Sequence, residues 1–223
     1  MKLIADSGST KTTWALLDGQ GLVSMYDSIG LNPRTTADGW LSRTMYEVSQ
    51  WVGNRLVDEV HFYGAGCGTE RACRDMACYI EERFEFAEVF VDSDLRGACI
   101  AALGNRPGMV GILGTGSNAC LYDGNRPTKR VPSLGYVLGD EGSGNHIGRC
   151  LLKAYFEERM PSDLRELMGR AYDMDYSNVI SQLYSQPRPN TYLASFTPFA
   201  AQHRDHRFVQ ELLNESFTAY FKH

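Results

Sequence analysis

One short unit occurs twice in the sequence, about 105 residues apart, and this repeat constrains the fold more than any other feature. In each copy an apolar strand leads into a loop of glycine and hydroxyl residues. A second strand follows and ends at an Asp-Gly turn. The copies begin at Ile4 and Met109. A period of this length predicts two duplicated α/β domains rather than a solenoid. We place them at residues 1–107 and 108–223.

The elements around each copy are read from hydrophobic periodicity. Short apolar runs bounded by turn residues predict strands, and two of them are Glu59 to Tyr63 and Glu88 to Val91. A stripe of apolar residues predicts a helix over about residues 36–52. A second long helix is expected after Gly144, and Pro161 should stop it at Met160.

Composition excludes several classes of function. Lys and Arg number 22 against 27 Asp and Glu, a net charge of −5, which argues against a general nucleic-acid-binding protein. The sequence has no apolar stretch of about 18 residues, so we expect no membrane span. The N-terminal residues lack a signal-peptide pattern, and the six cysteines form no CxxC pair. We therefore expect a cytoplasmic protein with reduced thiols.

Two glycine loops have the composition of phosphate-binding turns. Glycine lets backbone N–H groups approach an anion closely, and hydroxyl side chains add donors. The loops are Ser7-Gly8-Ser9-Thr10-Lys11 and Gly114-Thr115-Gly116-Ser117-Asn118. The first is not a P-loop, because a threonine precedes the lysine. Either loop alone is more simply an ordinary tight turn, but the pair at matching positions of a repeat favours a shared polyphosphate.

Three aspartates follow predicted strands, where the ligand crevice of an open α/β sheet lies. They are Asp6, Asp94 and Asp140. Phosphoryl transfer needs a magnesium site and a group that takes the proton of the acceptor hydroxyl. Asp6 suits a ligand of hydrated magnesium, and Asp94 suits the general base. The alternative for Asp94 is a cap on the helix that follows it.

The segment Gly135–Gly144 contains four glycines and two acidic residues, which is unsuitable for a core element. It leads directly into the predicted long helix. We therefore expect its N–H groups to be free to bind a ligand, as at other helix N-termini. A flexible loop without function is the alternative.

Together these stretches resemble the BadF/BadG/BcrA/BcrD ATPase family, and within it the N-acetylglucosamine kinase-like branch. That family belongs to the actin-like superfamily of sugar kinases and Hsp70-type ATPases. The motifs occur in family order across residues 1–160. They are Ile4–Thr12, Gly30–Pro33, Phe62–Cys67, Val91–Asp94, Ile112–Ser117 and Gly135–Gly144, the last of which runs into Ile147-Gly148.

The resemblance implies two ribonuclease-H-like α/β domains that close on a cleft, with ATP and Mg²⁺ as cofactors. Asp94 lies where such kinases keep their base, and Asp6 is the expected magnesium residue. The ATP phosphates would be held by Gly8, Ser9, Thr10, Lys11, Gly114 and Thr115. The amino sugar would be held by Asn32, Gly116, Ser117, Asn118, Gly135, Tyr136, Asp140 and Gly144. Tyr136 stands where the animal enzymes have tryptophan, so contacts to the N-acetyl group differ there.

The resemblance also implies that relatives continue beyond the last helix with an adenosine loop and further strands. The second domain is therefore expected to lack its last strands, to keep a sheet of about three strands, and to bind adenine weakly.

The function that follows is ATP-dependent phosphorylation of an amino sugar, N-acetylglucosamine or glucosamine. One alternative is an ATPase that drives electron transfer to a dehydratase or reductase through a shared iron–sulfur cluster. Another is a sugar-sensing module without catalysis. The partner is then a small sugar rather than nucleic acid or membrane, and a homodimer would be ordinary for such an enzyme.

Overall fold

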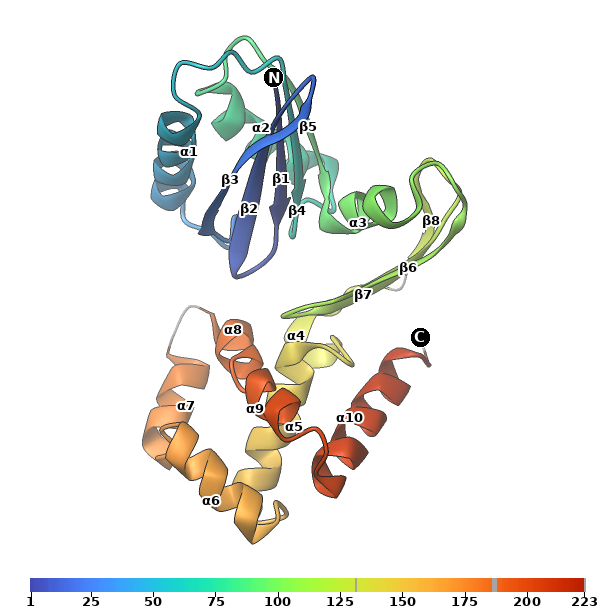
Figure 1. Ribbon diagram of the computed structural model, residues 1–223. Helices are drawn as coiled ribbons and strands as arrows, with labels where there is room; N and C mark the ends of the chain where they lie inside the picture. Colours follow the sequence, from blue (N-terminus) through green and yellow to red (C-terminus); the bar gives the residue numbers. More distant parts are fainter. Residues whose placement is uncertain (131, 186–187, 223) are drawn as a thin grey trace. The chain divides into compact units, whose positions relative to one another are not determined.

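The first glycine hairpin belongs to a five-stranded sheet (Figure 1). The computed structural model describes residues 1–130, 132–185 and 188–222. The strands are β1 (Lys2–Ser7), β2 (Lys11–Asp18), β3 (Gly21–Ile29), β4 (Glu59–Gly64) and β5 (Glu88–Ser93). Their order across the sheet is β3-β2-β1-β4-β5. β1, β2 and β3 pair antiparallel, whereas β4 pairs parallel with both β1 and β5.

Three helices accompany this sheet, namely α1 (Asp38–Val52), α2 (Glu70–Glu81) and α3 (Asp94–Leu103). The predicted helix over residues 36–52 is confirmed as α1, which buries Leu41, Met45, Val48 and Val52 at helical spacing. The core that α1 and α2 share with the sheet contains Trp14 and Phe62, whose rings lie 5.9 Å apart. Both side chains are fully buried.

The second glycine hairpin forms a sheet with the order β6-β7-β8, which confirms the expected three strands. Its strands are β6 (Gly108–Leu113), β7 (Ser117–Tyr122) and β8 (Pro127–Arg130). The chain divides into two compact units, and the hairpin is shared between them. Unit 1 comprises Met1–Val110 and Cys120–Lys129, and unit 2 comprises Gly111–Ala119 and Arg130–His223. The boundary that we placed at residue 107 stays a prediction.

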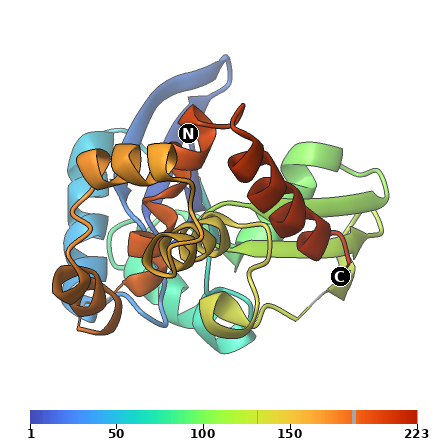
Figure 2. The same cartoon turned by 90° about the horizontal axis from the view of Figure 1, so that it is seen from below.

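Unit 2 is otherwise helical, and Figures 1 and 2 show its helices from yellow to red. They are α4 (Gly135–Leu138), α5 (Gly144–Phe156), α6 (Ser162–Ala171), α7 (Tyr176–Tyr184), α8 (Pro189–Ala194), α9 (Thr197–Gln202) and α10 (Arg207–Tyr220). The central helix is α5, which contacts α8, α9 and α10. Gly148 allows the closest of these approaches, because a methyl group there would overlap the backbone of Leu193.

The predicted end of the long helix at Met160 is wrong, since α5 ends at Phe156. Glu158 adopts a positive φ of 57°. The N–H groups of Arg159 and Met160 then both donate to the Ala154 carbonyl, at 3.0 and 3.1 Å. The chain thus leaves the helix through a tight turn before the proline is reached.

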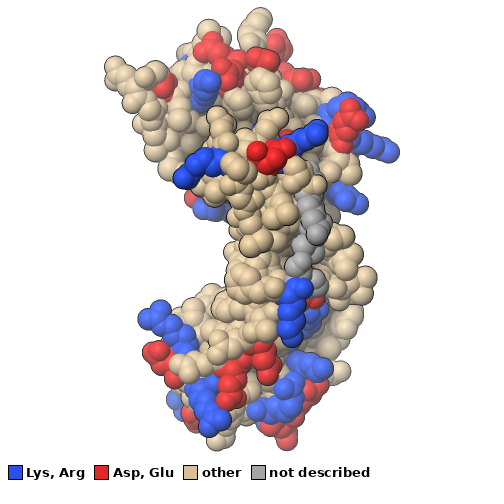
Figure 3. Space-filling model, turned by 90° about the vertical axis from the view of Figure 1, so that its right-hand side faces the viewer, with Lys and Arg blue, Asp and Glu red and all other residues tan. Residues whose placement is uncertain are grey.

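Acidic and basic side chains are interspersed on the face seen in Figure 3. Elsewhere on the surface, charged side chains pair within one helix, such as Arg43 with Glu47 at 3.0 Å. Exposed pairs of this kind contribute little to stability. None of the helices in the described residues has the length and apolar character needed to cross a membrane.

Candidate functional site

The first glycine loop closes the β1–β2 hairpin with a tight turn, in which the Gly8 N–H donates to the Lys11 carbonyl at 2.9 Å. Under the turn, the buried hydroxyls of Ser7 and Thr12 lie 2.7 Å apart. This bond fixes the loop from its inner side. Ser7 therefore has a structural role, and a phosphate would meet the backbone and hydroxyls of residues 8–10.

Gly30 supports this loop from the end of β3. Its N–H donates to the Thr10 carbonyl at 2.9 Å. A methyl group on Gly30 would lie 2.5 Å from the Gly8 carbonyl oxygen and 2.6 Å from the carbonyl carbon of Ser9. Only glycine fits this position without moving the loop, because the obstructing atoms belong to the backbone.

The side chain of Lys11 pairs with an acidic residue of β3. Its ammonium forms an exposed ion pair with Asp27 at 3.3 Å, and the Asp27 carboxylate also accepts from the Thr13 hydroxyl at 2.8 Å. The side chain therefore lies along β3 in this structure. A contact between Lys11 and a phosphate would need another rotamer.

Asp94 is the first residue of α3 and is half-buried. Ser93 rather than Asp94 caps the helix, because the Ser93 hydroxyl accepts from the Arg96 N–H at 3.3 Å. Burial raises the pKa of the Asp94 carboxyl, the hydrogen bond from the Leu95 N–H partly offsets this, and the Asp6 carboxylate raises the pKa further. A carboxylate with a raised pKa is a stronger base, as general base catalysis requires.

Asp6 lies on β1 between two buried residues and is itself exposed. Its carboxylate offers the oxygen ligands that magnesium prefers. In the described part of the chain, no three His, Cys, Asp or Glu side chains gather where they could hold a metal ion. A single exposed carboxylate such as Asp6 suits a magnesium ion that keeps most of its waters.

Asn32 is the predicted sugar ligand of unit 1, and its side chain covers Gly66. Gly66 has a φ of 88°, and a methyl group there would overlap the Asn32 amide. The Asn32 Oδ1 accepts from the Arg34 N–H at 2.9 Å. The backbone N–H of Asn32 donates to the Thr36 hydroxyl at 3.0 Å. Among the described residues no hydrogen bond engages Asn32 Nδ2, which leaves this group as a donor for a ligand oxygen.

The second glycine loop is bonded to the start of α5. The Gly144 N–H donates to the Gly114 carbonyl at 2.8 Å, and the Asn145 N–H donates to the Thr115 carbonyl at 3.0 Å. The expectation that N–H groups at this helix start are free for a ligand is therefore wrong. The carbonyls of the glycine loop satisfy them instead.

Asp140 lies directly over the same loop. Its Oδ1 accepts from the Ser117 N–H at 3.2 Å, and its Oδ2 accepts from Asn145 Nδ2 at 2.8 Å. A methyl group on Gly116 would meet these carboxylate oxygens at 3.0 to 3.1 Å. Asp140 follows the short helix α4 rather than a strand, which corrects its predicted position, and it has a positive φ of 60°.

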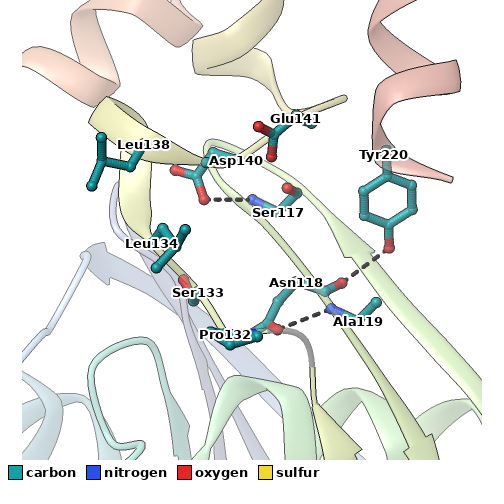
Figure 4. Close-up of a pocket in the computed structure, with 11 residues that line it drawn as sticks. Ser117, Asn118, Ala119, Pro132, Ser133, Leu134, Leu138, Asp140, Glu141 and Tyr220 are labelled. Atoms are coloured by element: carbon teal, nitrogen blue, oxygen red, sulfur yellow. Dashed lines mark hydrogen bonds between the residues drawn. The ribbon is translucent and has the colours of Figure 1, made fainter. Parts of the chain in front are cut away.

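A pocket opens beside Asp140 (Figure 4). Its lining residues are Ser117, Asn118, Ala119, Pro132, Ser133, Leu134, Leu138, Gly139, Asp140, Glu141 and Tyr220. Three of the predicted sugar ligands thus come together here, namely Ser117, Asn118 and Asp140. The Tyr220 hydroxyl donates to the Asn118 carbonyl at 3.0 Å. Two leucines of the lining, Leu134 and Leu138, are more than half exposed, which gives the pocket an apolar side.

Of the predicted sugar ligands outside this lining, three belong to the segment Gly135–Gly144. Gly135 begins α4 with a φ of 70°. Tyr136 packs against the core of unit 2, and its carbonyl accepts from Arg149 at 2.9 Å. A methyl group on Gly144 would lie 3.1 Å from the Thr197 hydroxyl. These positions shape the segment that presents Asp140.

Sequence reasoning missed Asn145 and Tyr220. Asn145 directly follows the glycine segment, so its polar side chain at a helix start was a usable signal. Tyr220 lies on the last helix, far along the chain from the pocket, and nothing in its local sequence marks it.

Each compact unit therefore carries its own set of candidate residues. Unit 1 holds Asp6, Gly8, Ser9, Thr10, Lys11, Asn32 and Asp94, and unit 2 holds the remaining predicted residues from Gly114 to Gly144.

Solved structures resemble the chain closely. A provisionally assigned N-acetylglucosamine kinase from Porphyromonas gingivalis is 36% identical, with a TM-score of 0.92 over 97% of this chain and 78% of that one. A second protein with the same provisional assignment, from Chromobacterium violaceum, is 19% identical, with a TM-score of 0.71 over 98% of this chain and 81% of that one. The second likeness is one of fold alone. No protein-family model and no curated protein matches the sequence.

The chain belongs to the same family as the Porphyromonas gingivalis protein. Its fold is the α/β fold of that protein, which confirms the α/β class expected from the glycine repeat.

Proposed function

We propose that this protein is an ATP-dependent kinase of an amino sugar, N-acetylglucosamine or glucosamine, in the N-acetylglucosamine kinase-like branch of the BadF/BadG/BcrA/BcrD family. The observation that carries the proposal is the Asp94 carboxyl, which is half-buried at the start of α3 with a raised pKa next to Asp6. The name of the Porphyromonas gingivalis relative supports the same substrate class.

Asp94 acts as the general base. It takes the proton of a sugar hydroxyl while that oxygen forms a bond to the γ-phosphorus of ATP and the bond to the ADP oxygen breaks. The products are a sugar phosphate, ADP and a proton, which Asp94 later releases to water. The raised pKa serves this step, because a stronger base takes the proton more readily at neutral pH.

Asp140 and its neighbours hold the sugar. The carboxylate is kept in place by the Ser117 N–H and by Asn145 Nδ2, so it accepts hydrogen bonds from sugar hydroxyls without turning. Asn118 lines the same pocket, and Leu134 and Leu138 offer apolar contacts to the ring or to an N-acyl group. Asn32 is the sugar ligand proposed for unit 1, and its Nδ2 is the donor it would offer.

The nucleotide and its metal ion are assigned to the two glycine loops. The backbone and hydroxyls of Gly8, Ser9 and Thr10 are suited to phosphate, as are the turn residues Gly114 and Thr115. Bound ATP supplies the phosphoryl group, and Mg²⁺ neutralises its charge. Asp6 would bind the ion through its waters, since the carboxylate is exposed beside Asp94.

The test is ADP release with Mg-ATP and a panel of N-acetylglucosamine, glucosamine, glucose and no sugar. We expect release that depends on an amino sugar, and we expect Asp94→Asn to reduce it by about 10²-fold to 10⁴-fold. Asp92→Asn is a matched control, because Asp92 lies two residues earlier, on β5. In the described residues, the hydrogen bonds to its Oδ1 come from the N–H and the hydroxyl of the next residue, Ser93. Release without any sugar would favour an ATPase, and sugar binding without release would favour a sensor.

A further inference from the structure

Asn145 is a fully buried polar residue that joins the two parts of the unit 2 site. It is the second residue of α5. One amide proton of Nδ2 is donated to the Thr115 carbonyl at 2.6 Å, and the other to Asp140 Oδ2 at 2.8 Å. The Asn145 backbone N–H donates to the same Thr115 carbonyl at 3.0 Å. One residue thus holds both the glycine loop and the carboxylate over it.

The other half of the Asn145 amide is unsatisfied. Its Oδ1 is buried and has no hydrogen-bond partner among the described residues. A buried acceptor in this state costs free energy, so the residue is a poor choice for stability alone. Its value must come from the two donors, which are directed at Thr115 and Asp140.

We propose that Asn145 is a positioning residue that fixes the Asp140 carboxylate over the second glycine loop and thereby sets the affinity for the sugar. The proposal deepens the proposed function and rests on it for the identity of the ligand. Without Asn145, the hydrogen bond that remains to the Asp140 carboxylate in the described residues is the longer one from the Ser117 N–H, at 3.2 Å. The carboxylate can then turn away, and no side chain ties it to Thr115.

The first test compares Asn145→Ala with Asn178→Ala. Asn178 is a matched control, because its Nδ2 also donates to an aspartate, Asp173, at 2.8 Å near the start of a helix, but on the exposed surface. We expect Asn145→Ala to raise the KM for the sugar by about 10-fold to 100-fold, the loss typical of a hydrogen bond to a charged group. The kcat should change far less, and Asn178→Ala should leave both unchanged. Equal losses of kcat and of ATP affinity would overturn the positioning role.

The second test uses Asn145→Asp, which places an acid between the Thr115 carbonyl and the Asp140 carboxylate. Two carboxylates at this distance favour the protonated form of one of them. The neutral acid can then donate one hydrogen bond. The measured quantity is the ratio of the sugar affinity of Asn145→Asp to that of the wild type at the same pH. We expect this ratio to rise as the pH is lowered from 8 to 5.5. The titrating neighbours Glu141 and His146 are present in both proteins, so the ratio cancels their effect. A ratio independent of pH would contradict the proposal.

The third test does not depend on turnover and separates this proposal from the proposed function. Thermal unfolding is measured for Asp140→Asn, for Asn145→Asp and for the double variant, in which an amide at position 140 faces a carboxylate at position 145. We expect the double variant to lose less Tm than the two single variants together, because an amide at position 140 can pair with a carboxylate at position 145. The lost bond to the Thr115 carbonyl is common to Asn145→Asp and the double variant. Additive losses would exclude the direct pairing. If the wild type releases no ADP with any sugar while the double variant recovers, the proposed function fails and the Asn145–Asp140 pairing stands.

Discussion

Gly97 of α3 lies against Tyr63 of β4, so close that a methyl group on Gly97 would stand 2.7 Å from the Tyr63 Cβ. The helix backbone therefore rests directly on the strand, and no side chain separates them. Asp94 is three residues earlier on the same helix. The Gly97–Tyr63 contact thus determines where the proposed base lies relative to β1 and its carboxylate Asp6.

The first prediction concerns Gly97→Ala. The added methyl group must push α3 away from β4, because the atoms it meets are close to the Tyr63 backbone. Overpacking of this kind costs about 1–3 kcal/mol of stability. We expect that loss in urea unfolding, together with a fall in kcat as Asp94 moves. Gly39→Ala is the control, since Gly39 is also helical and has no atom within 4 Å of the added methyl group. Equal effects of both substitutions would show that the contact has no special role.

The second prediction concerns the stability of Asp94→Asn. Folding raises the pKa of the Asp94 carboxyl, so the folded state favours the protonated form of this group. The stability that the protonated group contributes is therefore lost as the pH rises through the folded-state pKa. The neutral amide of Asn removes this loss and keeps the acceptor for the Leu95 N–H. We expect Asp94→Asn to unfold at a higher Tm than the wild type at pH 7.

This gain should disappear at acid pH, below the unfolded-state pKa of about 3.9, where the wild-type carboxyl is also neutral. Scanning calorimetry at several pH values measures the difference. A variant that is less stable than the wild type at pH 7 would show that Asp94 has a structural role that outweighs its burial.

The hairpins and the helix α1 could be predicted from sequence because their signals are local. Alternating apolar residues such as Leu3 and Ala5 mark one buried face of a strand, and glycine with hydroxyl residues marks the turn. The stripe that ends at Val52 likewise lies within one helix. These patterns need no knowledge of the rest of the chain.

The state of the segment Gly135–Gly144 could not be predicted, because its hydrogen-bond partners come from a distant part of the chain. Composition indicated a loop with free N–H groups. In the structure, however, the N–H groups of Gly144 and Asn145 donate to carbonyls of the second glycine loop. The Asn145–Thr115 pair, for example, is separated by 30 residues of chain. The same reason explains why Tyr220 was missed, since it reaches Asn118 from 102 residues away. A site built by tertiary contacts leaves little local trace.

The third prediction concerns Gly30→Ala. A methyl group here would stand 2.5 to 2.6 Å from backbone atoms of Gly8 and Ser9, which cannot move aside as a side chain could. The first loop must shift, so we expect a loss of about 1–3 kcal/mol in stability. The affinity for ATP should fall relative to the wild type, and it should fall more than the affinity for the sugar does. Gly19→Ala is the control, because Gly19 lies in the exposed β2–β3 turn with no atom within 4 Å. Unchanged ATP affinity in Gly30→Ala, measured by calorimetry, would remove the first loop from the nucleotide site.

The fourth prediction concerns His146, which links the start of α5 to α10. Its Nδ1 accepts from the Gly142 N–H at 3.3 Å, and it lies 2.6 Å from the Ser216 hydroxyl, which must therefore donate. Burial lowers the pKa of His146, the nearby Arg149 lowers it further, and Glu141 partly offsets this. The folded state thus favours the neutral imidazole.

The sign of the pH dependence follows from this lowered pKa. Above the unfolded-state pKa of about 6.5 both states are neutral and His146 costs nothing. As the pH falls below that value the unfolded state takes up a proton first, so stability is lost until the folded-state pKa is passed. We expect His146→Asn, whose Oδ1 can replace Nδ1 as the acceptor, to flatten the fall in Tm between pH 7 and pH 5. His203→Asn is the control, because it removes another histidine of unit 2, one that packs against the ring of Phe199 at 4.4 Å, and it should leave the slope in place. If the Tm of His146→Asn falls between pH 7 and pH 5 as steeply as that of the wild type, the acid sensitivity belongs to another group.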